Sequence, residues 1–111
     1  MPQIRFSPKA IADLEDAKRY ISDELSNPQA SAAFIALVIE KIQTLSTLPQ
    51  IGARLRTDIS SLNTYRFIQC KNYLVFYRAE EKFVSIIRVL YAKRDYFGLL
   101  EMDTRNNSDD F

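Results

Sequence analysis

Three segments rich in aromatic and β-branched residues, separated only by short polar breaks, constrain the fold of this chain more than any other feature. They are Thr64–Cys70 (TYRFIQC), Asn72–Ala79 (NYLVFYRA) and Phe83–Tyr91 (FVSIIRVLY). This composition is typical of β-strands. Breaks as short as Lys71-Asn72 and Glu80-Glu81-Lys82 leave room only for hairpins between antiparallel neighbours. The sequence therefore predicts an antiparallel meander in the second half of the chain.

The first half predicts one short strand followed by two helices. Gln3–Phe6 alternates apolar and polar residues, as a strand does. Ser7-Pro8 and Asn27-Pro28 each combine a capping side chain with a proline suited to the first helical position. Apolar residues recur at helical spacing behind each signal, and Pro49 and Gly52 end the second helix. These apolar residues form one stripe along each helix. The stripe of the first helix consists of Ile11, Leu14, Ala17, Ile21 and Leu25, and that of the second consists of Ala30, Phe34, Leu37, Val38, Ile42, Leu45 and Leu48.

We therefore predict an α+β fold in the order strand-helix-helix-strand-strand-strand, with a helical hairpin packed on a mostly antiparallel four-stranded sheet. Residues 50–63 are expected to form a loop or short edge element, and Arg94–Glu101 a last short helix. Residues 1–101 would form one domain, and residues 102–111 a polar, disordered tail. Both faces of the predicted strands are apolar, so we expect another chain, or a second copy in a homo-oligomer, to cover part of the second face.

The chain contains no histidine and one cysteine, Cys70. This composition excludes Ser-His and Cys-His catalysis, an internal disulfide and nearly all zinc enzymes. We expect neither a metal nor a cofactor. No apolar run is long enough to span a membrane, and no secretion signal is recognised, so a cytoplasmic protein is expected.

Charge is unevenly distributed along the chain, although the formal net charge is only +1. Residues 52–96 carry nine cations and four acids. Such a segment suits an anionic partner, and equally a solvated sheet surface of mixed charge. A row of tyrosines in the same segment suits stacking on unpaired bases, and equally a core or partner interface.

Three separate segments resemble the RelE/ParE superfamily of toxins from bacterial type II toxin–antitoxin modules. They are IRFSPKAIADLEDAKRYI, YRFIQCKNYLVFYR and IIRVLYAKRDY. The resemblance covers roughly residues 3–97 and is closer to the ParE-type members. It implies a toxin that inhibits growth and is neutralised by a cognate antitoxin, whose C-terminal segment wraps the toxin.

The resemblance leaves the mechanism open. ParE-like members bind DNA gyrase and are not enzymes. RelE-like members enter the ribosome and cut mRNA without a metal, using the 2′-hydroxyl of the substrate as nucleophile. Fixed guanidinium groups would then stabilise the charge of the transition state. A small nucleic-acid-binding or structural module without toxicity is a third possibility.

Residue roles carried over from the resemblance differ between the two mechanisms. If the chain is a nuclease, Arg94, Tyr96 and Arg66 are the expected catalytic residues. The nuclease pattern places an arginine where this chain has Tyr73, and this departure favours the ParE-like side. In either case Arg78, Arg88, Lys93 and Arg94 are the expected target-binding patch. Tyr73, Tyr77 and Tyr91 are the expected antitoxin contacts.

Overall fold

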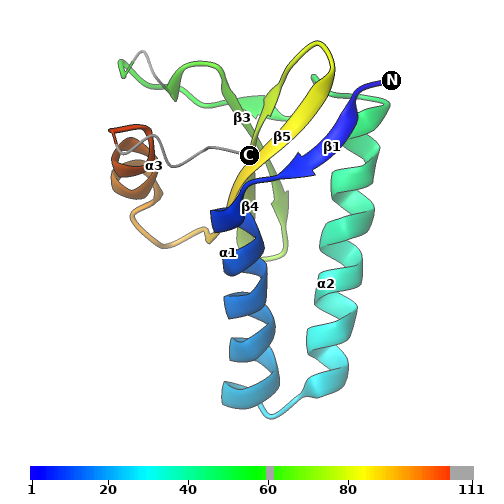
Figure 1. Ribbon diagram of the computed structural model, residues 1–111. Coiled ribbons are helices and arrows are strands. Elements are labelled where there is room, and N and C mark those ends of the chain that lie inside the picture. The colour runs from blue at the N-terminus through cyan, green and yellow to red at the C-terminus, as the bar shows by residue number, and fades with distance from the viewer. Residues whose placement is uncertain (60–61, 106–111) are drawn as a thin grey trace.

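Two helices pack against one face of a five-stranded sheet, and a third helix lies on the other face (Figure 1). The computed structural model describes residues 1–59 and 62–105. The elements in chain order are β1 (Gln3–Phe6), α1 (Pro8–Arg19), the π-helical η1 (Tyr20–Glu24), α2 (Pro28–Gln43), the 3₁₀ turn η2 (Thr44–Ser46), β2 (Ala53–Arg54), β3 (Tyr65–Cys70), β4 (Tyr73–Ala79), β5 (Phe83–Tyr91) and α3 (Tyr96–Arg105). None of the described helices is long and apolar enough to cross a membrane.

Both predicted helix starts are confirmed by their caps. Ser7 Oγ accepts a hydrogen bond from the Ala10 N–H at 3.0 Å, and Asn27 Oδ1 accepts one from the Ala30 N–H at 3.0 Å. A proline follows each cap at the first helical position. The helical hairpin is therefore fixed at both starts by interactions local in sequence.

The sheet is mixed and has the strand order β1-β5-β4-β3-β2. β1 pairs in parallel with β5, and the other pairs are antiparallel. The prediction of four strands is wrong because β2, of only two residues, pairs with β3 and adds a fifth strand at the edge. A strand of two residues is too short to show an alternating pattern, so the sequence suggested only a loop or short edge element there.

A β-bulge in β5 breaks the alternation that the sequence predicts. Phe76 lies opposite Arg88, but the next residue, Tyr77, lies opposite Ile86, so Ile87 has no partner across the strand. A bulge of this kind shifts all later side chains of the strand to the other face. The buried residues of β5 accordingly divide into Val84, Ile86 and Val89 on the α1–α2 side and Ile87 and Leu90 on the α3 side.

The second face of the sheet is covered by the chain itself, contrary to the expectation of a partner chain. Leu55 and Leu62, which precede β3, and Leu100 of α3 are buried against the strands on this side. α3 continues to Arg105, so the first four residues of the predicted tail are helical, and Asp103 among them is buried. Residues 106–111 lie outside the described residues.

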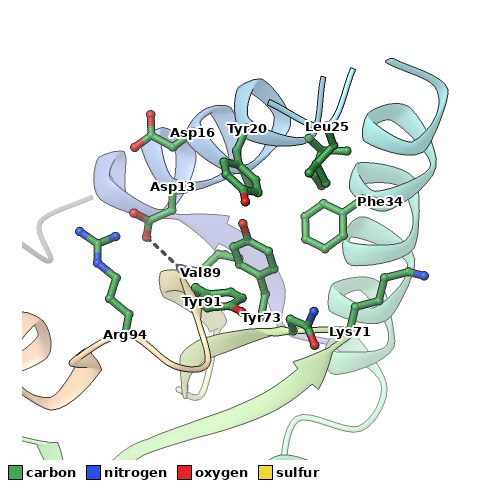
Figure 2. Close-up of a pocket in the computed structure, with 13 residues that line it drawn as sticks. Asp13, Asp16, Tyr20, Leu25, Phe34, Lys71, Tyr73, Val89, Tyr91 and Arg94 are labelled. Atoms are coloured by element: carbon green, nitrogen blue, oxygen red, sulfur yellow. Dashed lines mark hydrogen bonds between the residues drawn. The ribbon is translucent and has the colours of Figure 1, made fainter. Parts of the chain in front are cut away.

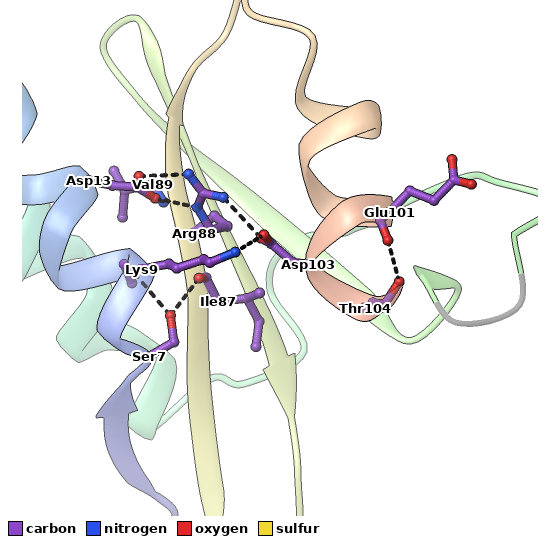
Figure 3. A network of polar contacts seen from close by, with 10 residues as sticks. Ser7, Lys9, Asp13, Ile87, Arg88, Val89, Glu101, Asp103 and Thr104 are labelled. Atoms are coloured by element: carbon purple, nitrogen blue, oxygen red, sulfur yellow. Dashed lines mark hydrogen bonds and ion pairs between the residues drawn. The ribbon is translucent and has the colours of Figure 1, made fainter. Parts of the chain in front are cut away.

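A buried ion network joins α1, β5 and α3 (Figure 3). The Arg88 guanidinium donates two hydrogen bonds to Asp13, at 2.8 and 2.9 Å, and a third to Asp103 at 3.0 Å. Lys9 Nζ reaches the other oxygen of Asp103 at 2.6 Å. Asp13 also accepts the backbone N–H of Val89 at 2.9 Å, on the same edge of β5 but beyond the last residue that pairs with β1. The network thus fixes α3 to the opposite layer.

Candidate functional site

A cleft of about 640 Å³ opens between the helical hairpin and the end of the sheet. In Figure 1 the hairpin of α1 and α2 projects past the ends of β4 and β5, which leaves the inner side of its tip uncovered by strands. The cleft is lined from α1, η1, α2, the β3–β4 turn and the ends of β4 and β5 (Figure 2). Its main side chains are Tyr20, Leu25, Phe34, Tyr73, Tyr91 and Arg94.

The π-helical turn η1 supplies one wall of the cleft. Tyr20 begins this turn and Leu25 follows it, and their side chains are 53% and 57% exposed. The chain then reverses through Ser26, whose φ of 50° lies in the left-handed region that few residues other than glycine adopt. π-helical turns in proteins are frequently found at functional sites. Two large apolar side chains held in solvent at such a turn indicate a binding surface.

Three aromatic rings form the centre of the cleft. The ring of Tyr73 lies 5.0 Å from that of Phe34 and 5.8 Å from that of Tyr91, between centroids. Burial raises the pKa of the Tyr73 hydroxyl, and the neighbouring Tyr20 and Tyr91 raise it further. At neutral pH this hydroxyl therefore keeps its proton and offers a hydrogen bond rather than acting as a base.

Charged groups lie at the rim of the cleft. Figure 2 shows Arg94 and Lys71 on opposite sides of the tyrosines. Arg94 is exposed, and within the described part of the chain it makes no ion pair. Asp13 also lines the cleft, but it is already committed to Arg88 and Val89. Arg94 and Lys71 make no ion pair among the described residues, whereas the exposed Asp16 pairs with Arg19 at 3.2 Å, so the charge at this rim that can serve a ligand is cationic.

The groups in and near the cleft are suited to recognising a ligand. Burial raises the pKa of the Cys70 thiol more than the nearby Lys41 and Lys71 lower it, so the thiol stays protonated. Among residues 1–59 and 62–105, no three His, Cys, Asp or Glu side chains form a group that could hold a metal ion. An aromatic, aliphatic cleft with a cationic rim is typical of a surface that binds a protein segment.

The three expected catalytic residues of the nuclease hypothesis do not meet. Arg94 lies at the cleft on the α1–α2 side of the sheet. Tyr96 packs on the other side, where its ring lies 5.2 Å from that of Phe76 and 5.0 Å from that of Phe97. Arg66 pairs with Tyr77, about 13 Å along β4 from the end that lines the cleft. These positions do not form one catalytic centre.

The expected target-binding patch is also dispersed. Arg88 is buried. Burial by itself lowers the pKa of its guanidinium, but the hydrogen bonds and charges of Asp13 and Asp103 outweigh it, so the pKa is raised. The guanidinium therefore keeps its positive charge, which the two carboxylates balance. Arg78 lies near the β4–β5 turn beside Glu80, at 3.7 Å. Only Lys93 and Arg94 remain as exposed neighbours, about 20 Å along β5 from Arg78.

Two of the three tyrosines expected to bind the antitoxin line the cleft, and the third does not. Tyr73 and Tyr91 are in the cleft, and Tyr91 is 40% exposed. Tyr77 is fully buried, donates a hydrogen bond to the Pro49 carbonyl at 2.9 Å and accepts one from the Gly52 N–H at 2.8 Å. Tyr77 is therefore a core residue that holds the loop after η2.

Sequence reasoning missed the helical wall of the cleft. Tyr20 lies outside the predicted apolar stripes, and Leu25 and Phe34 belong to these stripes as positions that face the core, but all three line the cleft. The sequence carried no signal for this wall, because the predicted helices, at about 1.5 Å per residue, are of about the same length as the nine-residue strand Phe83–Tyr91 at about 3.3 Å per residue. In the structure the hairpin tip projects past the ends of the strands, so the parts of the stripes near the tip have no strand to pack against.

Comparisons with known proteins agree with the resemblance in the sequence. The model of the ParE toxin family, described as the ParE toxin of the type II toxin–antitoxin system parDE, matches residues 4–96. Among solved structures, the chromosomal ParDE toxin–antitoxin system from P. aeruginosa matches with a TM-score of 0.70 and 18% identity, over 84% of this chain and 98% of that chain. The toxin–antitoxin complex RelBE2 from Mycobacterium tuberculosis matches with a TM-score of 0.58 and 26% identity, over 82% and 99% of the two chains. No curated protein sequence matches this chain.

Proposed function

This chain belongs to the ParE toxin family of type II toxin–antitoxin systems, and we propose that it is the growth-inhibiting toxin of such a module in the cytoplasm. It would act by binding DNA gyrase and would be neutralised by a cognate antitoxin. The observation that carries the proposal is the match to the family over residues 4–96, which covers β1 except Gln3, β2 to β5 and both helices of the hairpin.

The cleft supports the antitoxin half of the proposal. It offers aromatic and aliphatic side chains from two layers of the fold, and cations at its rim. A protein segment with one large apolar anchor and a nearby carboxylate would match Tyr73, Tyr91 and Arg94. Burial of such an anchor in an aromatic pocket is the usual source of most binding energy in a protein interface.

The dispersed arginines favour gyrase binding over mRNA cleavage. A ribosome-dependent nuclease needs cations and a proton-transfer group around one phosphate. Here Arg94, Tyr96 and Arg66 lie on different sides or at different ends of the sheet. A protein that only binds its target has no such requirement.

Two experiments test the proposal. The chain is expressed from an inducible promoter, with and without the antitoxin encoded beside its gene, and surviving colonies are counted. We expect growth arrest that the antitoxin relieves. The purified chain is then added to gyrase in a supercoiling assay and, in parallel, to a purified translation mixture whose mRNA is analysed by primer extension.

Loss of supercoiling with intact mRNA would agree with the proposal. Discrete breaks in the mRNA that require ribosomes would replace gyrase with the ribosome as target. Normal growth under full expression of the intact chain would overturn the toxin function itself.

A further inference from the structure

A basic and aliphatic surface lies at the β2 edge of the sheet, away from the cleft. We call it the β2-edge patch and define it by Leu48, Ile51, Arg54, Arg56 and Arg66. Leu48 and Ile51 are among the most exposed large apolar residues, at 53% and 59%. Arg54 and Arg56 are exposed as well.

Hydrogen bonds hold the parts of the β2-edge patch together. Arg66 Nη1 donates to the carbonyls of Gln50, at 3.3 Å, and Gly52, at 2.8 Å, on either side of Ile51. The Ile51 N–H in turn bonds the Leu48 carbonyl at 3.1 Å. The Arg66 guanidinium is therefore fixed against the turn that presents the two aliphatic side chains.

The cations of the patch lie close together at the edge of the sheet. Arg54 is directly opposite Arg66 in the β2–β3 pair, where like charges destabilise a sheet. Arg56 follows on the same side by alternation, because the Leu55 N–H continues the ladder to the Tyr65 carbonyl at 2.9 Å. No acid occurs between Glu40 and Asp58 in the sequence.

Neither Arg54 nor Arg56 makes an ion pair within residues 1–59 and 62–105. An anionic partner would remove the repulsion between Arg54 and Arg66. Repulsion that is present in the free chain and relieved in a complex adds to binding rather than to folding.

The aliphatic part of the patch indicates which kind of anion binds. Single-stranded nucleic acid is usually held by exposed aromatic rings on which bases stack. Here the nearby Tyr65 and Tyr77 are fully buried, and the exposed side chains are Leu48 and Ile51. Arginine is enriched in protein interfaces, and the buried core of such an interface is more apolar than the rest of the surface.

We infer that the β2-edge patch docks an acidic protein segment that also carries an aliphatic side chain, and that this segment belongs to the toxin's target. The inference rests on the proposed function, because it assigns a surface to the target of the toxin. The patch and the cleft are separated along α2: Phe34 is in the cleft, and α2 ends at Gln43, nine residues or about 13 Å further at helical rise, before the turn that carries Leu48. One chain can therefore present separate surfaces to target and antitoxin.

The test compares two charge-reversed chains in the gyrase supercoiling assay. Arg54→Glu/Arg56→Glu reverses the patch, and Lys18→Glu/Lys82→Glu makes the same change of net charge at two exposed positions elsewhere. We expect the patch variant to need at least tenfold more protein for half-inhibition. The control variant and Arg54→Lys/Arg56→Lys should stay within about twofold of the original chain. Antitoxin affinity, measured by isothermal titration, should be unchanged in all three.

Three results would overturn the inference while leaving the proposed function in place. The first is equal inhibition by the patch variant and the original chain. The second is a tenfold loss of antitoxin affinity in the patch variant, which would show that the antitoxin binds the patch. The third concerns a fluorescein-labelled 20-nucleotide single strand. If the original chain binds this strand and the patch variant does not, the patch binds nucleic acid. Absence of inhibition by the original chain would instead overturn the gyrase proposal on which the inference depends.

Discussion

The two faces of the sheet carry similar apolar surface but end up in different states. On the α3 side, Leu55, Leu62 and Leu100 close the surface from within the chain. On the α1–α2 side, the core is closed beneath the helices, but the end near Tyr73 and Tyr91 stays open as a cleft. The pattern of apolar residues in the strands therefore does not predict which face of the sheet stays open to a binding partner.

The difference between the faces depends on what anchors the covering helix. α3 is a short helix of ten residues, and it is attached both by the burial of Leu100 and by Asp103, which contacts Arg88 and Lys9. The α1–α2 hairpin is anchored along its length by side chains in the core, and only its projecting tip lacks a sheet beneath it. Closure on one side follows from buried leucines together with a polar network, and the cleft on the other side follows from the projection of the hairpin tip past the ends of the strands.

The largest effect is a loss of stability, expected when Arg88 is removed from the ion network on the α3 side of the sheet. In Arg88→Ala the carboxylates of Asp13 and Asp103 lose their buried guanidinium, and removing one partner of a buried ion pair costs about 3–5 kcal/mol. Urea unfolding followed by circular dichroism measures this loss. Lys82→Ala, at an exposed position, should change stability by less than about 0.5 kcal/mol. A loss for Arg88→Ala below about 1 kcal/mol would mean that the network does not hold α3.

The next effect concerns the open side and is a change in binding. Tyr91→Ala removes a half-exposed ring from the cleft and should weaken antitoxin binding by about 2 kcal/mol, or roughly thirtyfold, with little change in stability. Isothermal titration with the antitoxin measures the affinity. Leu48→Ala, an exposed apolar residue outside the cleft, is the matched control and should bind normally. Equal losses in the two variants would remove the distinction between the cleft and the rest of the surface.

A smaller effect separates Tyr77 from the tyrosines of the cleft. Tyr77→Phe leaves the Pro49 carbonyl and the Gly52 N–H without their partner, which costs about 1–2 kcal/mol of stability. The buried ring should leave antitoxin affinity unchanged. Thermal unfolding and titration of the same sample check both expectations. If the variant has unchanged stability but binds the antitoxin poorly, Tyr77 would be a contact residue of the antitoxin interface rather than a core residue.

The smallest effect is expected at Glu80, near the β4–β5 turn and far from both features. Burial raises the pKa of this carboxyl, but the hydrogen bond from Ser85 and the charges of Arg78 and Arg5 outweigh it, so the pKa is lowered. A lowered native pKa gives stability that is full at neutral pH and is lost as the pH falls below about 4. Because the group is partly exposed, the contribution should not exceed about 0.5 kcal/mol. Glu80→Gln should therefore differ from the original chain at pH 7 and match it at pH 3 in unfolding experiments.

Features set by neighbouring residues could be predicted from the sequence. The caps at Ser7 and Asn27, the helical hairpin and the meander of β3, β4 and β5 depend on patterns of a few residues. The two-residue β2 and the bulge at Ile87 could not be predicted, because both depend on pairing with a distant strand.

The same distinction applies to the candidate site. Tyr73, Tyr91 and Arg94 were identified from their own segments, and they do meet at the cleft. Arg88 was assigned to the surface because its partners, Asp13 and Asp103, lie 75 and 15 residues away in the sequence. The burial of a charged side chain is decided by partners that no local pattern reveals.

Hydrogen–deuterium exchange of the chain, alone and in complex with its antitoxin, tests most directly whether the open end of the α1–α2 side is the partner surface. We expect new protection in η1, in the β3–β4 turn and at the end of β5, all of which line the cleft. Exchange in α3 should stay the same, because its side of the sheet is closed by the chain itself. Protection confined to α3, with no change around the cleft, would contradict this assignment of the two faces.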